Sequence, residues 1–323
     1  MDKKLCVAYA SDDNYAKYLG ISLLSLLKTN KEFEKIDIFI LDCGIKNDNK
    51  ERLISVVKGY RREIHFISMK EAVSSLELNM GKRKISIASY ARLFLASVIP
   101  DTCSKILYLD CDTIVCKNLS GFWNVQLEKH MLAGVRDTVD RYFLRKIGLM
   151  SDDYYINAGI ILVNLDAWRK NNIKKRFIKF IIKHGGNVPH HDQGTINAVC
   201  NKEILIVHPK YNVTSNIYTF SAKTIKRMYN LKDFYPQKDL DKAKKSPVII
   251  HYTTGLVGRP WEENCSHPMK EKYIEFADNS PWKDDYIMLD SRSLSVKVFA
   301  ILFRYGPPWL SESVYRLGKW MLH

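Results

Sequence analysis

Residues 106–115 read Ile-Leu-Tyr-Leu-Asp-Cys-Asp-Thr-Ile-Val, an apolar run interrupted by two aspartates one residue apart. Such a run is typical of a buried strand in a parallel sheet, and open α/β sheets bind ligands at the carboxyl ends of their strands. Two acids that face the same way repel each other unless a cation lies beside them. Asp110 and Asp112 therefore predict a site for Mg²⁺ or Mn²⁺ carrying phosphates, because hard divalent ions prefer carboxylate oxygen. The alternative is a polar strand end with a turn or a helix cap.

The segments that precede this stretch alternate between strand and helix patterns. Apolar runs at residues 5–10, 36–41 and 64–67 predict strands, and helical spacing predicts helices at residues 18–27 and 47–60. This alternation predicts an α/β fold with a mostly parallel central sheet flanked by helices. No Gly-x-Gly-x-x-Gly and no Walker-type loop follows the first strand, so the usual dinucleotide and phosphate cradles are missing.

The loop after the first strand, residues 10–15, carries acids and an amide in place of glycines. These groups suit hydrogen bonds to a base and a ribose. Capping of the next helix by Asp12 or Asp13 is an equally good interpretation.

Two further polar positions lie near helix starts. Arg92 could be a surface charge, or it could reach an anion bound near the Asp-x-Asp stretch, since a guanidinium suits phosphate. Asp192 follows His190 and His191, but adjacent residues at a helix start point apart, so helix capping is favoured over a metal site.

A late apolar run, residues 248–252, predicts a strand that delivers His251. The loop that follows contains Gly255, Gly258 and Arg259. Glycines let the backbone approach a ligand closely, and an arginine there could hold a diphosphate.

Composition is that of an ordinary globular enzyme. Of the 323 residues, 46% are hydrophobic and 26% charged, and no apolar stretch reaches the length that spans a bilayer. There is no cleavable signal pattern and no Cys-x-x-Cys pair among the seven cysteines, so a cytosolic protein with reduced thiols is expected. The net charge of +15 permits phosphorylated small molecules or anionic lipid as partners. Nucleic acid is not expected, because no nucleic-acid-binding motif accompanies the charge.

Six short motifs, taken in order along the chain, resemble glycosyltransferase family 8. This family of retaining enzymes includes bacterial lipopolysaccharide α-galactosyltransferases and α-glucosyltransferases, and glycogenin. Each motif is weak alone, and the order of all six makes the resemblance specific over residues 5–285. The motifs are Ala10-Ser11-Asp12-Asp13-Asn14-Tyr15, Ser89-Tyr90-Ala91-Arg92, Tyr108-Leu109-Asp110-Cys111-Asp112, Asn157-Ala158-Gly159, Asp192-Gln193, and His251-Tyr252 with Pro260-Trp261.

The resemblance implies a single GT-A type catalytic domain at residues 1–285. It implies Mn²⁺-dependent transfer, with Mg²⁺ as the alternative ion, of a hexose from UDP-galactose or UDP-glucose. The acceptor would be a glycan, glycolipid or glycoprotein in the synthesis of surface polysaccharide, lipopolysaccharide or glycoprotein glycan. The implied contacts are Ala10, Asp12 and Asn14 with uracil and ribose; Asp110, Asp112 and His251 with the metal; Arg92, Asp137, Asn157, Asp192 and Gln193 with the donor sugar; Gly255 or Gly258 and Arg259 with the diphosphate; and Cys111 and Ala158 with the donor as well.

Two positions depart from the family pattern. The loop from His251 to Pro260 is two residues longer, with Arg259 where lysine is expected, and Gly194 stands where many members have an acid. Gly194 removes one candidate for a nucleophile beneath the anomeric carbon. Our hypothesis is that the acceptor hydroxyl attacks from the face that UDP leaves, while the amide oxygen of Gln193 steadies the cationic sugar.

The chain ends in a basic, aromatic-rich stretch, residues 286–323, interrupted by Pro307-Pro308. This pattern indicates an amphipathic helical tail that lies in the interface of an anionic membrane and is too short and too charged to span it. The protein would then be cytoplasmic and peripheral on the inner membrane face. The alternative is a C-terminal helix docked on the catalytic domain.

Two other functions compete with sugar transfer. A sugar-phosphate nucleotidyltransferase would need a glycine-rich basic loop after the first strand, which residues 11–15 do not supply. A non-catalytic nucleotide-sugar binding protein would have no use for Asp110, Asp112 and His251 together.

Overall fold

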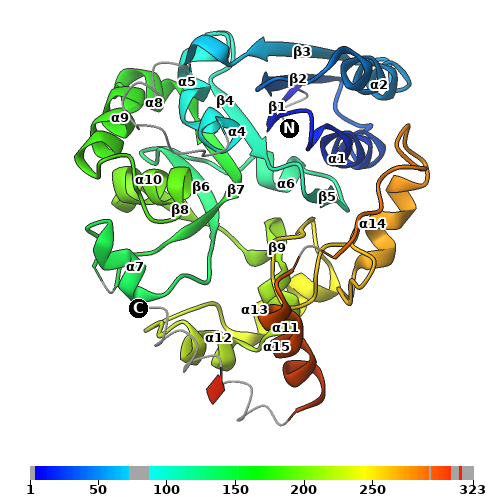
Figure 1. Ribbon diagram of the computed structural model, residues 1–323. Coiled ribbons are helices and arrows are strands. Elements are labelled where there is room, and N and C mark those ends of the chain that lie inside the picture. Colours follow the sequence, from blue (N-terminus) through cyan, green and yellow to red (C-terminus); the bar gives the residue numbers. More distant parts are fainter. Residues whose placement is uncertain (1–3, 73–86, 151, 291, 307–312, 315–323) are drawn as a thin grey trace.

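A sheet of seven strands forms the centre of the molecule, in the order β3-β2-β1-β4-β7-β6-β8 (Figure 1). This computed structural model describes residues 4–72, 87–150, 152–290, 292–306 and 313–314. Strands β1 to β4 run parallel, whereas β7 is antiparallel to both its neighbours. The predicted α/β fold with a mostly parallel sheet is thus confirmed. The strands are β1 (Lys4–Ser11), β2 (Lys35–Asp42), β3 (Glu63–Ser68), β4 (Lys105–Leu109), β6 (Leu132–Arg136), β7 (Ile156–Asn164) and β8 (Ile204–Ile206).

Residues 106–115 form two strands and not the single buried strand that their apolar pattern predicted, although Asp110 and Asp112 do lie past the carboxyl end of the first strand, as expected. The stretch divides between β4, in the middle of the large sheet, and β5 (Thr113–Val115), which belongs to a second sheet of order β5-β10-β9. Between them the chain turns, and the hydroxyl of Thr113 donates a hydrogen bond to the carbonyl oxygen of Asp110 at 2.8 Å. Because β5 pairs with β10 (Ile249–His251), this turn brings the two acids to the junction of the two sheets.

Helices cover both faces of the large sheet (Figure 1). Helices α1 and α2 lie on one face, and α4, α5 and α8 to α10 lie on the other. The helices of this part are α1 (Ala16–Thr29), α2 (Asn47–Lys58), α4 (Ile87–Ala91), α5 (Leu95–Val98), α6 (Ser120–Trp123), α7 (Arg141–Lys146), α8 (Leu165–Lys170), α9 (Ile173–Lys183) and α10 (His191–Cys200), with 3₁₀ turns η1 (Arg92–Phe94) and η2 (Asn201–Glu203).

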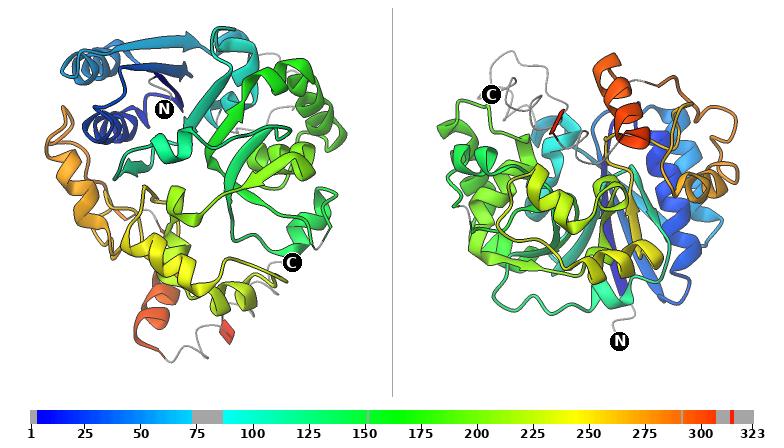
Figure 2. Two further views of the ribbon diagram at one scale, coloured as in Figure 1. Left: turned by 180° about the vertical axis from the view of Figure 1, so that it is seen from behind. Right: turned by 90° about the horizontal axis from the view of Figure 1, so that it is seen from below.

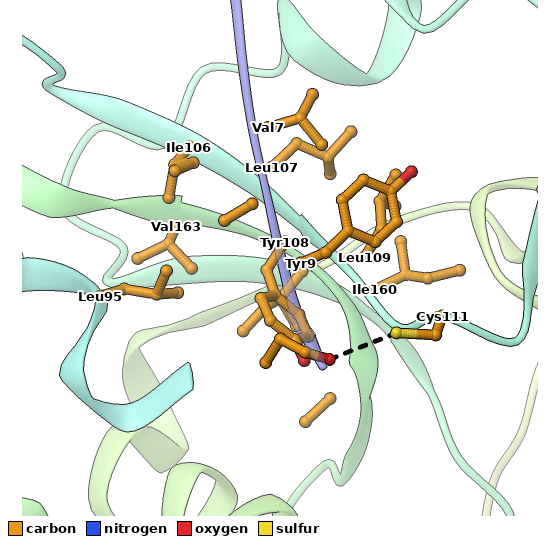
Figure 3. Packing of buried hydrophobic residues seen from close by; sticks show 14 of the residues in the cluster. Val7, Tyr9, Leu95, Ile106, Leu107, Tyr108, Leu109, Cys111, Ile160 and Val163 are labelled. Atoms are coloured by element: carbon orange, nitrogen blue, oxygen red, sulfur yellow. Dashed lines mark hydrogen bonds between the residues drawn. The ribbon is translucent and has the colours of Figure 1, made fainter. Parts of the chain in front are cut away.

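The central strands are buried on both faces, which explains why they read as continuous apolar runs. Val7 of β1 is in register with Leu107 of β4, and Figure 3 shows their side chains in this core. All seven cysteines are free thiols in this structure.

The C-terminal half of the chain adds a smaller apolar cluster beside the second sheet. Helix α15 packs on this cluster at the rim of the molecule, where the ring of Phe303 lies 4.9 Å from that of Phe220 (Figure 2). No helix in the described part of the chain is both long and apolar enough to cross a bilayer. Residues 291, 307–312 and 315–323 of the predicted tail lie outside the described residues. The elements here are η3 (Pro209–Tyr211), β9 (Val213–Thr214), α11 (Ser215–Thr219), α12 (Ala222–Met228), α13 (Gln237–Lys245), α14 (Lys270–Ala277) and α15 (Leu294–Tyr305).

Candidate active site

Two carboxylates and one imidazole converge where the two sheets meet. Asp110 follows β4, Asp112 precedes β5, and His251 is the last residue of β10. Nε2 of His251 lies 3.1 Å from Oδ1 of Asp112 and 3.9 Å from Oδ2 of Asp110. One possible ligand atom from each residue lies within 4.8 Å of those from the other two. The turn between β4 and β5 therefore places both acids beside His251, which lies 139 positions after Asp112 in the sequence.

Strand β7 makes room for this cluster with a glycine. A Cβ on Gly159 would lie 2.4 Å from Cε1 of His251 and 2.5 Å from Oδ2 of Asp110. Real Cβ atoms do not approach other atoms so closely, so only glycine lets β7 pass this close to the acids. The carbonyl oxygen of Gly159 also accepts a hydrogen bond from the amide of Asp110 at 2.7 Å.

Two arginines flank the acids. Arg92, which is buried, lies 3.0 Å from Oδ1 of Asp110 through Nη2 and 2.8 Å from Oδ2 of Asp192 through Nε. Arg259 lies 3.4 Å from Oδ2 of Asp112 through Nη2, and its Nη1 donates to the hydroxyl of Tyr15 at 2.9 Å. The negative charges of the cluster are thus held in place by cations on both sides.

Burial and charge act against each other on the ionisable groups of this site. Burial disfavours the ionised form of Asp112, but His251 and Arg259 outweigh it and lower the pKa of that carboxyl. Burial also disfavours charge on His251, yet Asp112 raises the pKa of the imidazole. For Asp192, the effect of burial exceeds the opposing effect of the positive charge on Arg92 and raises the pKa of the carboxyl to about 6. A buried carboxyl whose pKa is raised in this way is typical of functional sites.

A cavity of about 280 Å³ opens beside the acids. Among the loop residues predicted to bind a nucleotide, Ala10 and Asp12 line it, together with Tyr15, whereas Asn14 is exposed and is not part of the lining. Oδ1 of Asp12 accepts a hydrogen bond from the amide of Tyr15 at 3.1 Å, so this acid shapes the loop as well. The remaining lining residues are Ala88, Ser89, Arg92, Tyr108, Asp110, Cys111, Asp112 and Arg259.

The side chain of Cys111 is buried, and its thiol contacts the end of β1. Its Sγ donates to the carbonyl oxygen of Ala10 at 3.2 Å, drawn as a dashed line in Figure 3. Cys111 thereby ties the Asp-x-Asp turn to the end of β1.

The predicted sugar-binding residues form a connected polar group just after β6, on β7 and on α10. Nε2 of Gln193 and Nδ2 of Asn157 both donate to Oδ2 of Asp137, at 2.9 and 3.1 Å. Oε1 of Gln193 accepts from the amide of Ala158 at 3.0 Å, and the carbonyl oxygen of Ala158 accepts from Nη1 of Arg92 at 2.6 Å. The structure thus brings these predicted residues together.

At the start of α10, Asp192 does not have the role that the sequence analysis favoured, which was helix capping. Asp192 does not cap the helix; it is buried and faces Arg92. No metal-binding cluster forms at His190 and His191 within the described residues. At Gly194 a Cβ would lie 2.0 Å from the carbonyl oxygen of Pro189, so the backbone leaves no room for an acid at this position.

The glycines of the loop after β10 do not line the cavity, although Arg259 does. Gly258 has a φ of +73°, a conformation that favours glycine, and its neighbours include Glu262 and Arg292. Sequence reasoning missed one residue of the site, Asn212, which is fully buried against His251. No pattern around position 212 indicated it, because its partners come from distant parts of the chain.

Comparison with known proteins agrees with this architecture. The model of the glycosyl transferase family 8 matches residues 6–265. General stress protein A of Bacillus subtilis is 27% identical over 284 residues, which cover 87% of this chain and 96% of that protein. The lipopolysaccharide 1,2-glucosyltransferase of Escherichia coli is 26% identical over 286 residues, 87% of this chain and 80% of that one. The lipopolysaccharide 1,3-galactosyltransferase of Salmonella typhimurium is 24% identical over 288 residues, 86% of this chain and 79% of that one.

Among solved structures, the galactosyltransferase LgtC in complex with donor and acceptor sugar analogues superposes with a TM-score of 0.70 at 24% identity, covering 86% of this chain and 96% of LgtC. This likeness identifies the fold as GT-A, as predicted. Since the family model spans most of the sequence, the chain belongs to glycosyl transferase family 8.

Proposed function

We propose that this glycosyltransferase moves a hexose, galactose or glucose, from UDP to a glycan, glycolipid or glycoprotein acceptor, with retention and with Mn²⁺ or Mg²⁺. The observation that carries the proposal is the convergence of Asp110, Asp112 and His251 beside the cavity that the loop after β1 lines. The relatives named as lipopolysaccharide glucosyl- and galactosyltransferases support a hexose as the transferred group.

The donor set of the cluster fits a divalent cation. It offers two carboxylates and one imidazole within a shared space that Gly159 keeps open. Mn²⁺ accepts both oxygen and nitrogen ligands, whereas Mg²⁺ prefers oxygen, so His251 favours Mn²⁺. When bound, the ion would neutralise the charge that develops on the departing UDP.

Residues around the cavity would hold the nucleotide. Ala10 and Asp12 would contact uracil and ribose, and Arg259 would pair with the diphosphate, since its guanidinium already reaches across the cavity to Tyr15. Asn14, Gly255 and Gly258 lie outside the lining, so their proposed contacts with UDP require the loops to close.

The polar group beyond the acids would hold the donor sugar. Asp192 pairs with the buried Arg92, which makes it a poor nucleophile and a better partner for sugar hydroxyls. The amide oxygen of Gln193 accepts one hydrogen bond from Ala158, and a carbonyl oxygen has two lone pairs. The second lone pair can steady positive charge on the sugar while the acceptor hydroxyl attacks from the face that UDP leaves.

A donor-hydrolysis screen tests this function and separates it from its rivals. With UDP-galactose, UDP-glucose and other UDP-sugars, we expect metal-dependent release of UDP from one of the two hexose donors and its loss with EDTA. A nucleotidyltransferase would instead form a nucleotide sugar and pyrophosphate from UTP and a hexose 1-phosphate. A non-catalytic binder would bind the donor without turnover. Either of these two results would refute the proposal.

The catalytic domain at residues 1–285 would be held at an anionic membrane surface by the chain that follows it. One face of α15 docks through Phe303, while Leu294, Val298, Ile301 and Tyr305 are exposed at spacings of four, three and four residues. Such a stripe on one face of a basic protein suits an interfacial helix. Both sequence interpretations of the tail, docked helix and membrane contact, are therefore compatible.

A further inference from the structure

The imidazole of His251 is held from its far side by a fully buried asparagine. Asn212 lies between η3 and β9, with no exposed surface. Its Oδ1 is 3.1 Å from Nδ1 of His251, and its Nδ2 is 3.0 Å from Oδ1 of Asn157. Asn212 therefore connects the acid–histidine cluster to the polar group around Asp137.

The partners of Asn157 fix the orientation of both amides. The backbone N–H of Gly159 donates to Oδ1 of Asn157 at 3.1 Å, and Nδ2 of Asn157 donates to Oδ2 of Asp137 at 3.1 Å. The atom that Asn157 turns to Asn212 is therefore an oxygen, so Asn212 must present its NH₂ group there. This leaves its oxygen facing Nδ1 of His251, and an amide oxygen can only accept a hydrogen bond, so Nδ1 must carry the proton and donate it to this bond.

We infer that Asn212 is a positioning residue for metal binding. By accepting from Nδ1–H it directs the Nε2 lone pair of His251 toward Asp110 and Asp112. Partners that orient a metal-bound histidine in this way typically contribute about 10–100-fold to metal affinity. The inference rests on the proposed function, because it requires His251 to be a metal ligand. The same amide also donates a hydrogen bond to Asn157. Asn212 therefore links His251 to the residues that are proposed to hold the donor sugar.

Mn²⁺ binding to the UDP-loaded protein, measured by electron paramagnetic resonance of free Mn²⁺, tests the inference. Asn212→Ala is expected to bind Mn²⁺ about 10–100-fold more weakly. Asn212→Asp keeps an oxygen for Nδ1–H and should bind Mn²⁺ with an affinity close to wild type. It loses the donor to Asn157, however, so the KM for the donor sugar should rise.

Asn30 provides the matched control. It is equally buried, and its amide contacts Leu26, Thr29 and Leu119, away from the site. Asn30→Ala should lower the thermal stability while leaving the Mn²⁺ affinity unchanged. If Asn212→Ala behaves in the same way, or if Asn212→Asp binds Mn²⁺ as weakly as Asn212→Ala, the inference is overturned. If the wild type itself binds no Mn²⁺ in the presence of UDP, that result refutes the proposed metal site, and with it the function on which the inference about Asn212 rests.

A measurement on the unmodified protein does not depend on the folding of any variant. With ¹⁵N-labelled histidine, UDP and diamagnetic Mg²⁺, NMR should show His251 with its proton on Nδ1 and none on Nε2. A proton on Nε2 with none on Nδ1 would contradict the inference.

Discussion

At the scale of single residues, Arg259 links the loop after β1 to the acidic pair. Its guanidinium contacts both Tyr15 and Asp112 and lines the cavity. Charge-assisted hydrogen bonds to phosphate contribute about 1.5–3 kcal/mol each, which corresponds to about 10–100-fold in affinity.

We therefore predict that Arg259→Met raises the KM for the UDP-sugar about 10–100-fold. Arg259→Lys should retain part of this affinity, because it keeps the charge and loses the bidentate geometry. Steady-state kinetics with the exposed Arg145→Met as control would check this. Unchanged kinetics in Arg259→Met would remove Arg259 from the diphosphate site.

The raised pKa of Asp192 predicts that the free energy of unfolding depends on pH. Burial raises its pKa to about 6 from 3.8, so this group favours the folded state fully below pH 3.8, and that contribution is lost as the pH rises through about 6. Between about pH 4.5 and pH 8 the loss amounts to about 2 kcal/mol.

Asp192→Asn removes this titration. Urea unfolding at both pH values should show the variant gaining about 2 kcal/mol on the wild type at the higher pH. A difference between the two proteins that does not change with pH would contradict the raised pKa.

Residue types and motif order were enough to predict most of the residues that the site brings together. Asp110, Asp112 and His251 converge, and Arg92 faces Asp192. Whether a loop residue lines the cavity depends on the course of the loop, and this could not be predicted from residue types and motif order. Asn14 and the two loop glycines stand in the expected motifs but outside the cavity lining, because the surrounding fold sets the course of these loops.

At the scale of elements, the strands at the start of the chain follow their apolar runs within about one residue. Burial on both faces explains the runs of β1 and β2, whereas β3 is a partly exposed strand at the edge of the sheet. The division of residues 106–115 between two sheets was not predictable. Apolar residues on either side of Asp110 and Asp112 look alike whether they enter one sheet or two. Only the pairing of β5 with β10 distinguishes the two cases.

Strand β7 offers a prediction at this scale. Gly159→Ala should abolish turnover while the protein stays folded, because its Cβ would lie within 2.5 Å of both Asp110 and His251. The matched control is Gly134→Ala on β6, whose Cβ would lie 2.5 Å from Cδ1 of Ile156, a flexible tip in the apolar core.

The control should lower the unfolding temperature and leave the KM for the donor unchanged. Activity assays and circular dichroism on both variants would check this. An active Gly159→Ala protein would show that β7 does not limit the space around the acids.

At the scale of the whole molecule, the exposed stripe on α15 adds an outward-facing apolar face to a strongly basic protein. Replacing Leu294 and Val298 together with asparagine removes exposed apolar surface outside the pocket that α15 forms with the loop after β10. We predict loss of binding to anionic liposomes with unchanged activity on soluble acceptors.

Flotation assays would measure this binding, with Ile182→Asn on α9 as control, since Ile182 is also an exposed apolar residue. Liposome binding that persists in the double variant would refute the role of α15.

The central claim is that Asp110, Asp112 and His251 hold a metal ion that in turn holds UDP. Titration calorimetry of UDP binding, with and without Mn²⁺, to the wild type and to Asp112→Asn tests it most directly. We predict that Mn²⁺ strengthens UDP binding to the wild type by at least about tenfold, that is, about 1.4 kcal/mol, and that Asp112→Asn loses this gain. UDP binding that is equally tight without the metal, or a gain that survives in Asp112→Asn, would contradict the account.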